Sequence, residues 1–260
     1  MPSTELKLLG IWKILSLIFI ICQLKYVLNC PPMFLKINDD CFFSSGASDN
    51  FCKAGNQCIR AGELKGLTLL LPGYKRAQYL KSVYVSSVSL WTSLSNVTAL
   101  IDFKYPLLRD GDLDSIHSNE VNWSPSEPIQ SNAHTFLTTP SNTWTTTNEN
   151  SSVPLRAICY LFKSNPLVSR KIRFDVVQTP NSQTYFSKDP NHNGCTSEID
   201  GVTQLECAMR CSNAPHCRTV YYSASLRKCV QMLHVDAALP HYFVQTVGRN
   251  WLRMTMVKII

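Results

Sequence analysis

The sequence predicts an α+β protein with two small domains, each fastened by disulfide bonds. The chain has 260 residues, a length that suits two domains of about 100–150 residues each. Of its 11 cysteines, five lie within residues 30–159 and five within residues 195–229. A hydrophobic content of 45% and a charged content of 17% are typical of folded globular chains and not of disordered ones.

Residues 1–29 are predicted to be a signal peptide that directs the chain to the extracellular space. Lys7 and Lys13 precede a short apolar run, Ile14–Ile21, which falls short of the ~18 residues that a membrane-spanning helix needs. The alternative is an uncleaved signal anchor of a type II membrane protein. We favour secretion because Cys30 opens the first domain without the stalk that an anchored domain usually has.

Two further features agree with secretion. Sequons for N-linked glycosylation begin at Asn96, Asn122 and Asn150. Removal of the leader takes Cys22 with it and leaves an even number of cysteines, as oxidised extracellular proteins prefer. No Cys-x-x-Cys pair occurs, so the spacing favours neither a zinc ribbon nor a thioredoxin-like redox site.

The first domain, residues 30–162, is predicted to begin with a hairpin and a helix. Cys30 and Cys41 close a short loop of extended apolar residues, which indicates a stapled hairpin. The helix that follows is predicted because three residues recur on one helical face, namely Phe51, Ala54 and Cys58. Gly62 is predicted to end this helix.

The remainder of the first domain is predicted to contain a second helix and two strands. The helix is expected over residues 75–84, and an apolar run at residues 90–94 predicts a buried strand. The following stretch, to about Pro154, is rich in Ser, Thr, Asn and Pro and is predicted to form loops. A final strand is expected at residues 156–162.

In this order, these features resemble the C-type-lectin-like family. The likeness is carried by Ala54-x3-Cys58-x3-Gly62-x-Leu64 in the first helix, by Trp91-Thr-Ser-Leu94 where the family has Trp-Ile-Gly-Leu, by Trp123 with Glu127-Pro128, by Trp144, and by Ala157-Ile-Cys159-Tyr160 at the end. The resemblance covers residues 30–162 and implies a lectin-like fold with a Cys58–Cys159 bridge.

The resemblance also implies a ligand-binding loop region. Its candidate residues are Trp123, Glu127, Pro128, Ile129 and Trp144. Sugar-binding members of the family hold calcium with Glu-Pro-Asn and Asn-Asp, whereas this chain has Glu127-Pro128-Ile129 and Thr145-Thr146. Because calcium needs six to eight oxygen ligands and Ile129 supplies none, we expect no metal ion and no cofactor at this position.

A short linker, residues 163–167, is predicted to lead into a second domain at residues 168–260. Thr203 and Glu206 form a capping box, which predicts the start of a helix. Two cysteines four residues apart, Cys207 and Cys211, face the same side of that helix.

The second domain has a recognisable cysteine pattern, Cys-x3-Cys-x5-Cys, followed by strands expected at residues 220–222 and 229–232. This pattern is similar to the PAN/apple family, which has a small α+β fold. The resemblance implies the bridges Cys207–Cys229 and Cys211–Cys217.

One cysteine of each domain has no partner under these two resemblances. They are Cys52 and Cys195. The pair could bridge the two domains, bridge two chains or remain as free thiols. We favour a bridge between the domains.

The positive charge of the mature chain lies in the second domain. From Lys163 onward, 12 Lys and Arg face 6 Asp and Glu, a net charge of +6, whereas residues 30–162 carry 10 and 11, a net charge of −1. A basic surface could bind heparin or another sulfated polysaccharide. Candidates for such a patch are Arg170, Lys171, Arg173, Arg210, Arg218, Arg227 and Lys228. The competing interpretation is that these charges only solvate the surface.

Catalytic motifs are missing from the sequence. It contains no Gly-x-Ser-x-Gly, no His-Glu-x-x-His and no phosphate-binding glycine loop, and its six histidines are scattered. We therefore expect a secreted, non-enzymatic recognition protein that binds a protein or a carbohydrate, and not nucleic acid, without the usual calcium site. The alternatives are binding of sulfated glycans through the second domain and a disulfide-linked structural or matrix role.

Overall fold

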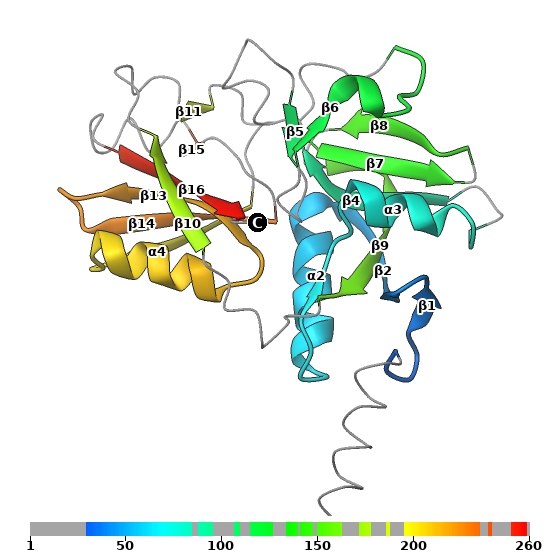
Figure 1. Cartoon of the computed structure of the whole chain (residues 1–260), viewed down its shortest axis with the longest axis horizontal. Coiled ribbons are helices and arrows are strands. Elements are labelled where there is room, and N and C mark those ends of the chain that lie inside the picture. Colours follow the sequence, from blue (N-terminus) through cyan, green and yellow to red (C-terminus); the bar gives the residue numbers. More distant parts are fainter. Residues whose placement is uncertain are drawn as a thin grey trace, which may run out of the picture.

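The chain forms two α+β modules that lie side by side, a first at residues 30–162 and a second at residues 172–258 (Figure 1). The computed structural model describes residues 30–84, 88–95, 107–109, 115–126, 134–139, 141–147, 150–162, 172–177, 186–187, 195–234, 239–240 and 251–258. The predicted leader and the predicted linker lie outside these residues. Among the helices described, none combines the length and the apolar content that crossing a bilayer requires.

Within the described residues, nine strands of the first module make one sheet. They are β1 (Leu35–Ile37), β2 (Asp40–Asn50), β3 (Leu69–Leu70), β4 (Val88–Ser95), β5 (Leu107–Arg109), β6 (Ser115–His117), β7 (His134–Thr139), β8 (Thr143–Thr147) and β9 (Asn150–Leu161). The main path is β1-β2-β9-β4-β5-β6, with β3 added to β9 and a β7–β8 ribbon added to β4. The antiparallel pair β1–β2, in which Lys36 is opposite Cys41, forms the expected hairpin.

The beginning and the end of the first module meet in the pair β2–β9. Phe42 lies opposite Tyr160, and a bulge falls between Ser44 and Gly46. Gly46 has a φ of 118°, a conformation that glycine adopts at little cost. The long pair closes the module, and the segment between the two strands supplies its helices and the rest of its sheet.

Helix α2 (Phe51–Glu63) lies between the first sheet and the second module (Figure 1). Asn50 caps it by accepting a hydrogen bond from the Lys53 backbone N–H at 2.9 Å. Gly62 does not end the helix, which continues to Glu63. A Cβ at position 62 would lie 2.5 Å from the Leu67 carbonyl oxygen, so glycine is needed there for a close approach of the following chain.

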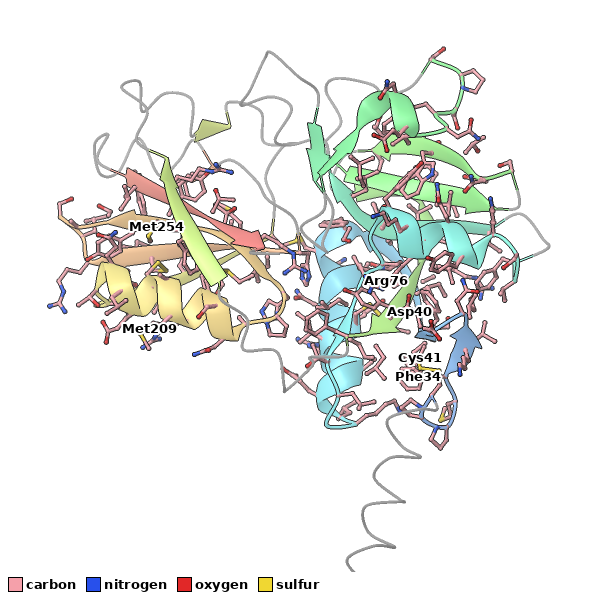
Figure 2. All side chains as sticks on the ribbon, in the orientation of Figure 1. Phe34, Asp40, Cys41, Arg76, Met209 and Met254 are labelled. Atoms are coloured by element: carbon pink, nitrogen blue, oxygen red, sulfur yellow. A yellow bond between two sulfur atoms is a disulfide. The ribbon has the colours of Figure 1, made fainter. Side chains whose placement is uncertain are left out.

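Helix α3 (Tyr74–Leu80) is shorter than the expected helix at residues 75–84. It ends in turns, where the Val83 backbone N–H donates to the Leu80 carbonyl at 3.1 Å. Arg76 of this helix forms an ion pair with Asp40 of the β1–β2 hairpin, and the two residues lie next to each other in Figure 2.

The prediction of loops before Pro154 is wrong for much of that segment. The strands β7 and β8 form an antiparallel ribbon in which Leu137 is opposite Trp144, and β9 begins at Asn150. The threonines suggested a loop by their polarity, but threonine is β-branched and favours strands. In β8, Trp144 and Thr146 are buried while their neighbours are half-buried, which is the alternation of a strand.

In the described part of the second module, five antiparallel strands form a sheet in the order β10-β16-β13-β14-β12. Its strands are β10 (Ile172–Val177), β12 (Cys195–Asp200), β13 (Cys217–Ser223), β14 (Lys228–Leu233) and β16 (Trp251–Lys258), and β11 (Phe186–Ser187) pairs in parallel with β15 (Leu239–Pro240). The two predicted strands of this domain fall within β13 and β14. Helix α4 (Gln204–Asn213) packs on the sheet through Cys207 and Cys211.

The predicted capping box at the start of α4 is confirmed. The Glu206 backbone N–H donates to the Thr203 hydroxyl at 3.2 Å, and the Thr203 backbone N–H donates to the Glu206 carboxylate at 2.7 Å. The backbone hydrogen bond from Thr203 is the largest of the contacts that lower the pKa of Glu206.

Five disulfide bonds fasten the described residues. They are Cys30–Cys41, Cys52–Cys195, Cys58–Cys159, Cys207–Cys229 and Cys211–Cys217. The second of these joins α2 to β12, so in the structure neither thiol is free or bonded to another chain. One hydrophobic cluster continues through this contact, from Phe51 and Trp91 in the first module to Tyr221, Met232 and Trp251 in the second.

Candidate functional site

Trp144 anchors the predicted ligand-binding region from the inner side of β8. Its side chain is 0% exposed and lies against the Tyr74 ring, with centroids 5.1 Å apart and an interplanar angle of 36°. The Tyr74 hydroxyl donates to the Glu120 carbonyl at 2.6 Å. Burial raises the pKa of Tyr74, so the phenol is neutral and acts as a hydrogen-bond donor.

The segment Asn122–Ser124 lies alongside β8 and adds a short extended segment to the edge of the sheet that β8 forms. The Trp144 backbone N–H donates to the Asn122 carbonyl at 2.9 Å, and the Ser124 N–H donates to the Trp144 carbonyl at 2.8 Å. Trp123 and Trp144 are therefore bridge partners in a short parallel pair. The half-buried Trp123 packs against the same cluster as Trp144, and the structure thus brings two of the predicted site residues together.

Hydroxyl groups lie on the outer side of β8 and of the Asn122–Ser124 segment, opposite the buried Trp144. We call Ser124, Thr143 and Thr145 the hydroxyl face. The Ser124 and Thr145 hydroxyls lie 3.1 Å apart and the Thr143 hydroxyl lies 2.9 Å from that of Ser141, both within hydrogen-bond distance. All three residues of the face are half-buried, and the two threonines add methyl groups beside the hydroxyls. This face was not predicted from the sequence, although the alternation along β8 is a signal that could have indicated it.

The described residues of this region do not fit a calcium ion. Thr145 and Thr146 stand where the resemblance implies an amide and a carboxylate. The Thr145 hydroxyl pairs with Ser124, and Thr146 is only 3% exposed. Calcium is held mainly by carboxylate and carbonyl oxygens. Among the residues that the structure describes, no group of three or more His, Cys, Asp or Glu side chains is placed to hold a metal ion.

Several other predicted site residues cannot be placed from the described residues. Glu127, Pro128, Ile129 and Asn96 lie outside them. Asn150 is described only as the first residue of β9. Of the three sequon asparagines, Asn122 is thus the one whose side chain is described, and it is exposed.

The candidates for a basic patch do not form one open surface. Arg218 is 5% exposed, and its guanidinium donates to the carbonyls of Pro215 and Cys217 at 2.7 and 2.9 Å. This corrects its assignment to the patch, because the side chain satisfies buried backbone groups and does not face solvent. Arg170 and Lys171 lie outside the described residues, and Arg173 is described only as a position in β10.

The remaining three basic candidates, Arg210, Arg227 and Lys228, differ in their surroundings. Lys228 forms ion pairs with Glu198 at 2.5 Å and with Asp200 at 3.6 Å. The hydrogen bond with Glu198 is the largest of the effects that raise the pKa of Lys228. The Arg227 guanidinium donates to the Gly201 carbonyl at 3.1 Å. Arg210 is exposed in the last turn of α4.

The two modules pack against each other around the Cys52–Cys195 bridge, which was favoured from the sequence, whereas the side-chain packing beside it was not predicted. We call the contact of Phe51 and Gly55 with His234, together with the Cys52–Cys195 bridge, the seam. The Phe51 and His234 rings meet edge-on at 6.3 Å. Since His234 is 3% exposed, the seam is a packed interior and not a loose contact.

No family model and no curated protein matches the chain. Among solved structures, the C-type lectin CEL-I from Cucumaria echinata is 12% identical, with 52% of this chain and 99% of that chain covered and a TM-score of 0.39. The mouse scavenger receptor C-type lectin carbohydrate-recognition domain is 18% identical, with 52% and 100% covered and a TM-score of 0.39. A calcium-independent type II antifreeze protein is 18% identical, with 53% and 98% covered and a TM-score of 0.38. These structural neighbours are C-type-lectin-like domains, and they cover about half of the chain.

Proposed function

We propose that the chain is a secreted, non-enzymatic recognition protein that binds a carbohydrate or protein ligand at the hydroxyl face without a calcium ion. The second module is, in this proposal, a PAN/apple-like domain that the seam holds at a fixed position beside the first. The observation that carries the proposal is the Ser124–Thr145 hydroxyl contact at a position where a calcium-dependent site requires charged or amide oxygens.

The chemistry of the hydroxyl face supports a polar, uncharged ligand. Threonine and serine hydroxyls both donate and accept hydrogen bonds, as sugar hydroxyls and backbone amides do. The adjacent strand and the Asn122–Ser124 segment hold these side chains through main-chain hydrogen bonds, so little ordering is needed when a ligand binds.

The five intramolecular disulfide bonds support an extracellular location, since such bonds persist in oxidising compartments. The ion pairs of Lys228 and the burial of Arg218 leave fewer free cations in the second module than its sequence suggests. A neutral glycan or a protein surface therefore suits the chain better than a sulfated polysaccharide.

The proposal is tested on a glycan array, with and without a calcium chelator. We expect binding that the chelator does not change and that the double variant Thr143→Val/Thr145→Val reduces at least tenfold, because valine keeps the shape and removes the hydroxyls. Ser212→Ala, which removes a hydroxyl from α4 in the second module, is the matched control and should bind as the wild type does.

Two outcomes contradict the proposal. Loss of binding on chelation would mean that calcium is part of the site. Equal binding by the wild type and by the double valine variant would place the ligand elsewhere on the chain.

A further inference from the structure

A sequon for N-linked glycosylation lies at the edge of the hydroxyl face. The sequon is Asn122-Trp123-Ser124, and its serine is itself a member of the face. The Asn122 side chain is exposed, as the attachment site of a bulky, solvent-facing glycan must be.

The position of the Asn122 amide is fixed by hydrogen bonds. Main-chain hydrogen bonds join Trp144 to Asn122 and to Ser124. The Asn122 amide nitrogen also donates to the Asn142 carbonyl at 3.0 Å. Asn142 is followed directly by Thr143, so the amide nitrogen is bonded to the residue next to a member of the hydroxyl face.

We propose that Asn122 carries an N-linked glycan that covers the hydroxyl face and limits the size of the ligands that reach it. In the transfer, the Asn122 amide nitrogen forms a bond to C1 of the first sugar of a lipid-linked oligosaccharide diphosphate. The bond from C1 to the diphosphate oxygen breaks, the lipid diphosphate leaves, and the amide gives up one proton. The inference rests on the proposed function in one respect, namely that the surface covered by the glycan is a ligand-binding site.

The structure also sets the order of events. The Ser124 hydroxyl, which the sequon requires, lies 3.1 Å from the Thr145 hydroxyl, and the backbone of the sequon is bonded to β8. An extended, accessible sequon is available only before this pairing forms. The sugar is therefore added before β8 pairs with residues 122–124, and the substituted amide keeps one N–H with which to donate to Asn142.

Occupancy is tested first, on the full chain secreted from a eukaryotic cell line. Enzymatic removal of N-glycans in heavy-oxygen water converts a modified asparagine into a labelled aspartate, which peptide mass spectrometry locates. We expect the label at Asn122 in the wild type and in Ser124→Thr, which keeps the sequon. Finding Asn122 as an unlabelled asparagine in the secreted wild type overturns the inference.

Shielding is tested with a thiol placed on the hydroxyl face by Thr143→Cys. We expect a large polyethylene-glycol maleimide to react at least tenfold more slowly when Asn122 is glycosylated than in the Asn122→Gln background. A small maleimide should react at similar rates in both. Asn213→Cys on α4 is the matched control and should show no dependence on Asn122. Equal reaction rates with the large reagent, with and without the glycan, would overturn the inference. Neither test requires a ligand, so each can fail or succeed independently of whether the hydroxyl face binds the proposed ligand.

Discussion

His234 of the second module lies flat against Gly55 of α2, with no room between them for a methyl group. A Cβ at position 55 would lie 2.6 Å from two atoms of the imidazole ring and 2.7 Å from a third. The ring cannot easily move away, because His234 is 3% exposed, packs on Phe51 and donates its backbone N–H to the His216 carbonyl at 2.7 Å. The glycine is thus a requirement of the seam and not of the helix that contains it.

Gly55→Ala is expected to destabilise the protein by about 1–2 kcal/mol. Overpacking costs about 1–3 kcal/mol, and the better helix propensity of alanine returns up to about 1 kcal/mol. In a His234→Ala background the clash is absent, so the same substitution should become neutral or stabilising. Urea unfolding of the four proteins measures this coupling, and a Gly55→Ala effect that is the same in both backgrounds would contradict the packing described.

The bridge across the seam should contribute more to stability than the bridge in the hairpin. The Cys52–Cys195 bridge closes a sequence separation of 143 residues and the Cys30–Cys41 bridge one of 11. Because the Cys58–Cys159 bridge lies inside the longer loop and shortens it to roughly 40 residues, the chain-entropy relation gives about 4 kcal/mol for the seam bridge and about 3 kcal/mol for the hairpin bridge. We expect Cys52→Ala/Cys195→Ala to lower the free energy of unfolding more than Cys30→Ala/Cys41→Ala does.

The variant without the seam bridge should nevertheless keep its modules together. The hydrophobic cluster that contains Phe51, Trp91, Tyr221 and Trp251 spans both modules, and its burial does not depend on the bridge. Size-exclusion chromatography of Cys52→Ala/Cys195→Ala should therefore give the elution volume of the wild type. An increase in apparent size would show that the bridge alone holds the modules.

Local signals in the sequence predicted the start of α4 and the buried face of α2. Thr203 and Glu206 specify the start of α4 by contacts within four residues, and the apolar spacing of Phe51, Ala54 and Cys58 specifies the buried face of α2. Such features depend on near neighbours in the chain, which is why the sequence alone reveals them.

Several features that depend on packing between distant segments were not predicted. Gly62 resembled a helix stop, but the contact that demands glycine is with the Leu67 carbonyl. Arg218 resembled a surface cation, and only the packing of β13 shows that it is buried. Alternation along β8 could have indicated Thr143 and Thr145, but the contact of Thr145 with Ser124 joins two segments that no local pattern connects.

Acid should weaken the protein through His216. Burial is the largest cause that lowers the pKa of this imidazole, Arg218 lowers it further, and Glu63 of α2 opposes both. As the pH falls below about 6.5, the ordinary pKa of histidine, His216 takes up a proton more readily in the unfolded chain than in the folded chain. The free energy of unfolding therefore decreases with falling pH until the pH passes the lower pKa of the folded state. Above that ordinary value His216 contributes no pH dependence.

Thermal melts at about pH 5 and about pH 7.5 check this assignment. His216→Asn should reduce the difference in melting temperature between the two conditions. Glu63→Gln should enlarge it, since it removes the charge that raises the pKa of His216. An unchanged pH dependence in both variants would assign the acid sensitivity to other groups.

Arg76 fastens the hairpin to the rest of the first module. Its guanidinium lies 4.4 Å from the centroid of the Tyr160 ring in β9, and its Nε donates to the Asp40 carboxylate at 3.2 Å. Both charged side chains are largely shielded, with 30% and 20% of their surface exposed. We expect Arg76→Ala to cost about 1–2 kcal/mol, because it removes a partly desolvated stacking contact together with an ion pair.

Two further variants separate these contributions. Arg76→Lys keeps the charge but loses the planar group that stacks on Tyr160, so its cost should lie between those of the wild type and of alanine. Lys53→Ala breaks the 3.5 Å ion pair between Lys53 and Asp49. These two side chains are 69% and 60% exposed, so the substitution should lower the free energy of unfolding by less than about 0.5 kcal/mol. Urea unfolding compares the four proteins. Equal costs for Arg76→Ala and Lys53→Ala would mean that the stacking on Tyr160 adds nothing, and the hairpin would then depend on the Cys30–Cys41 bridge and its strand pairing alone.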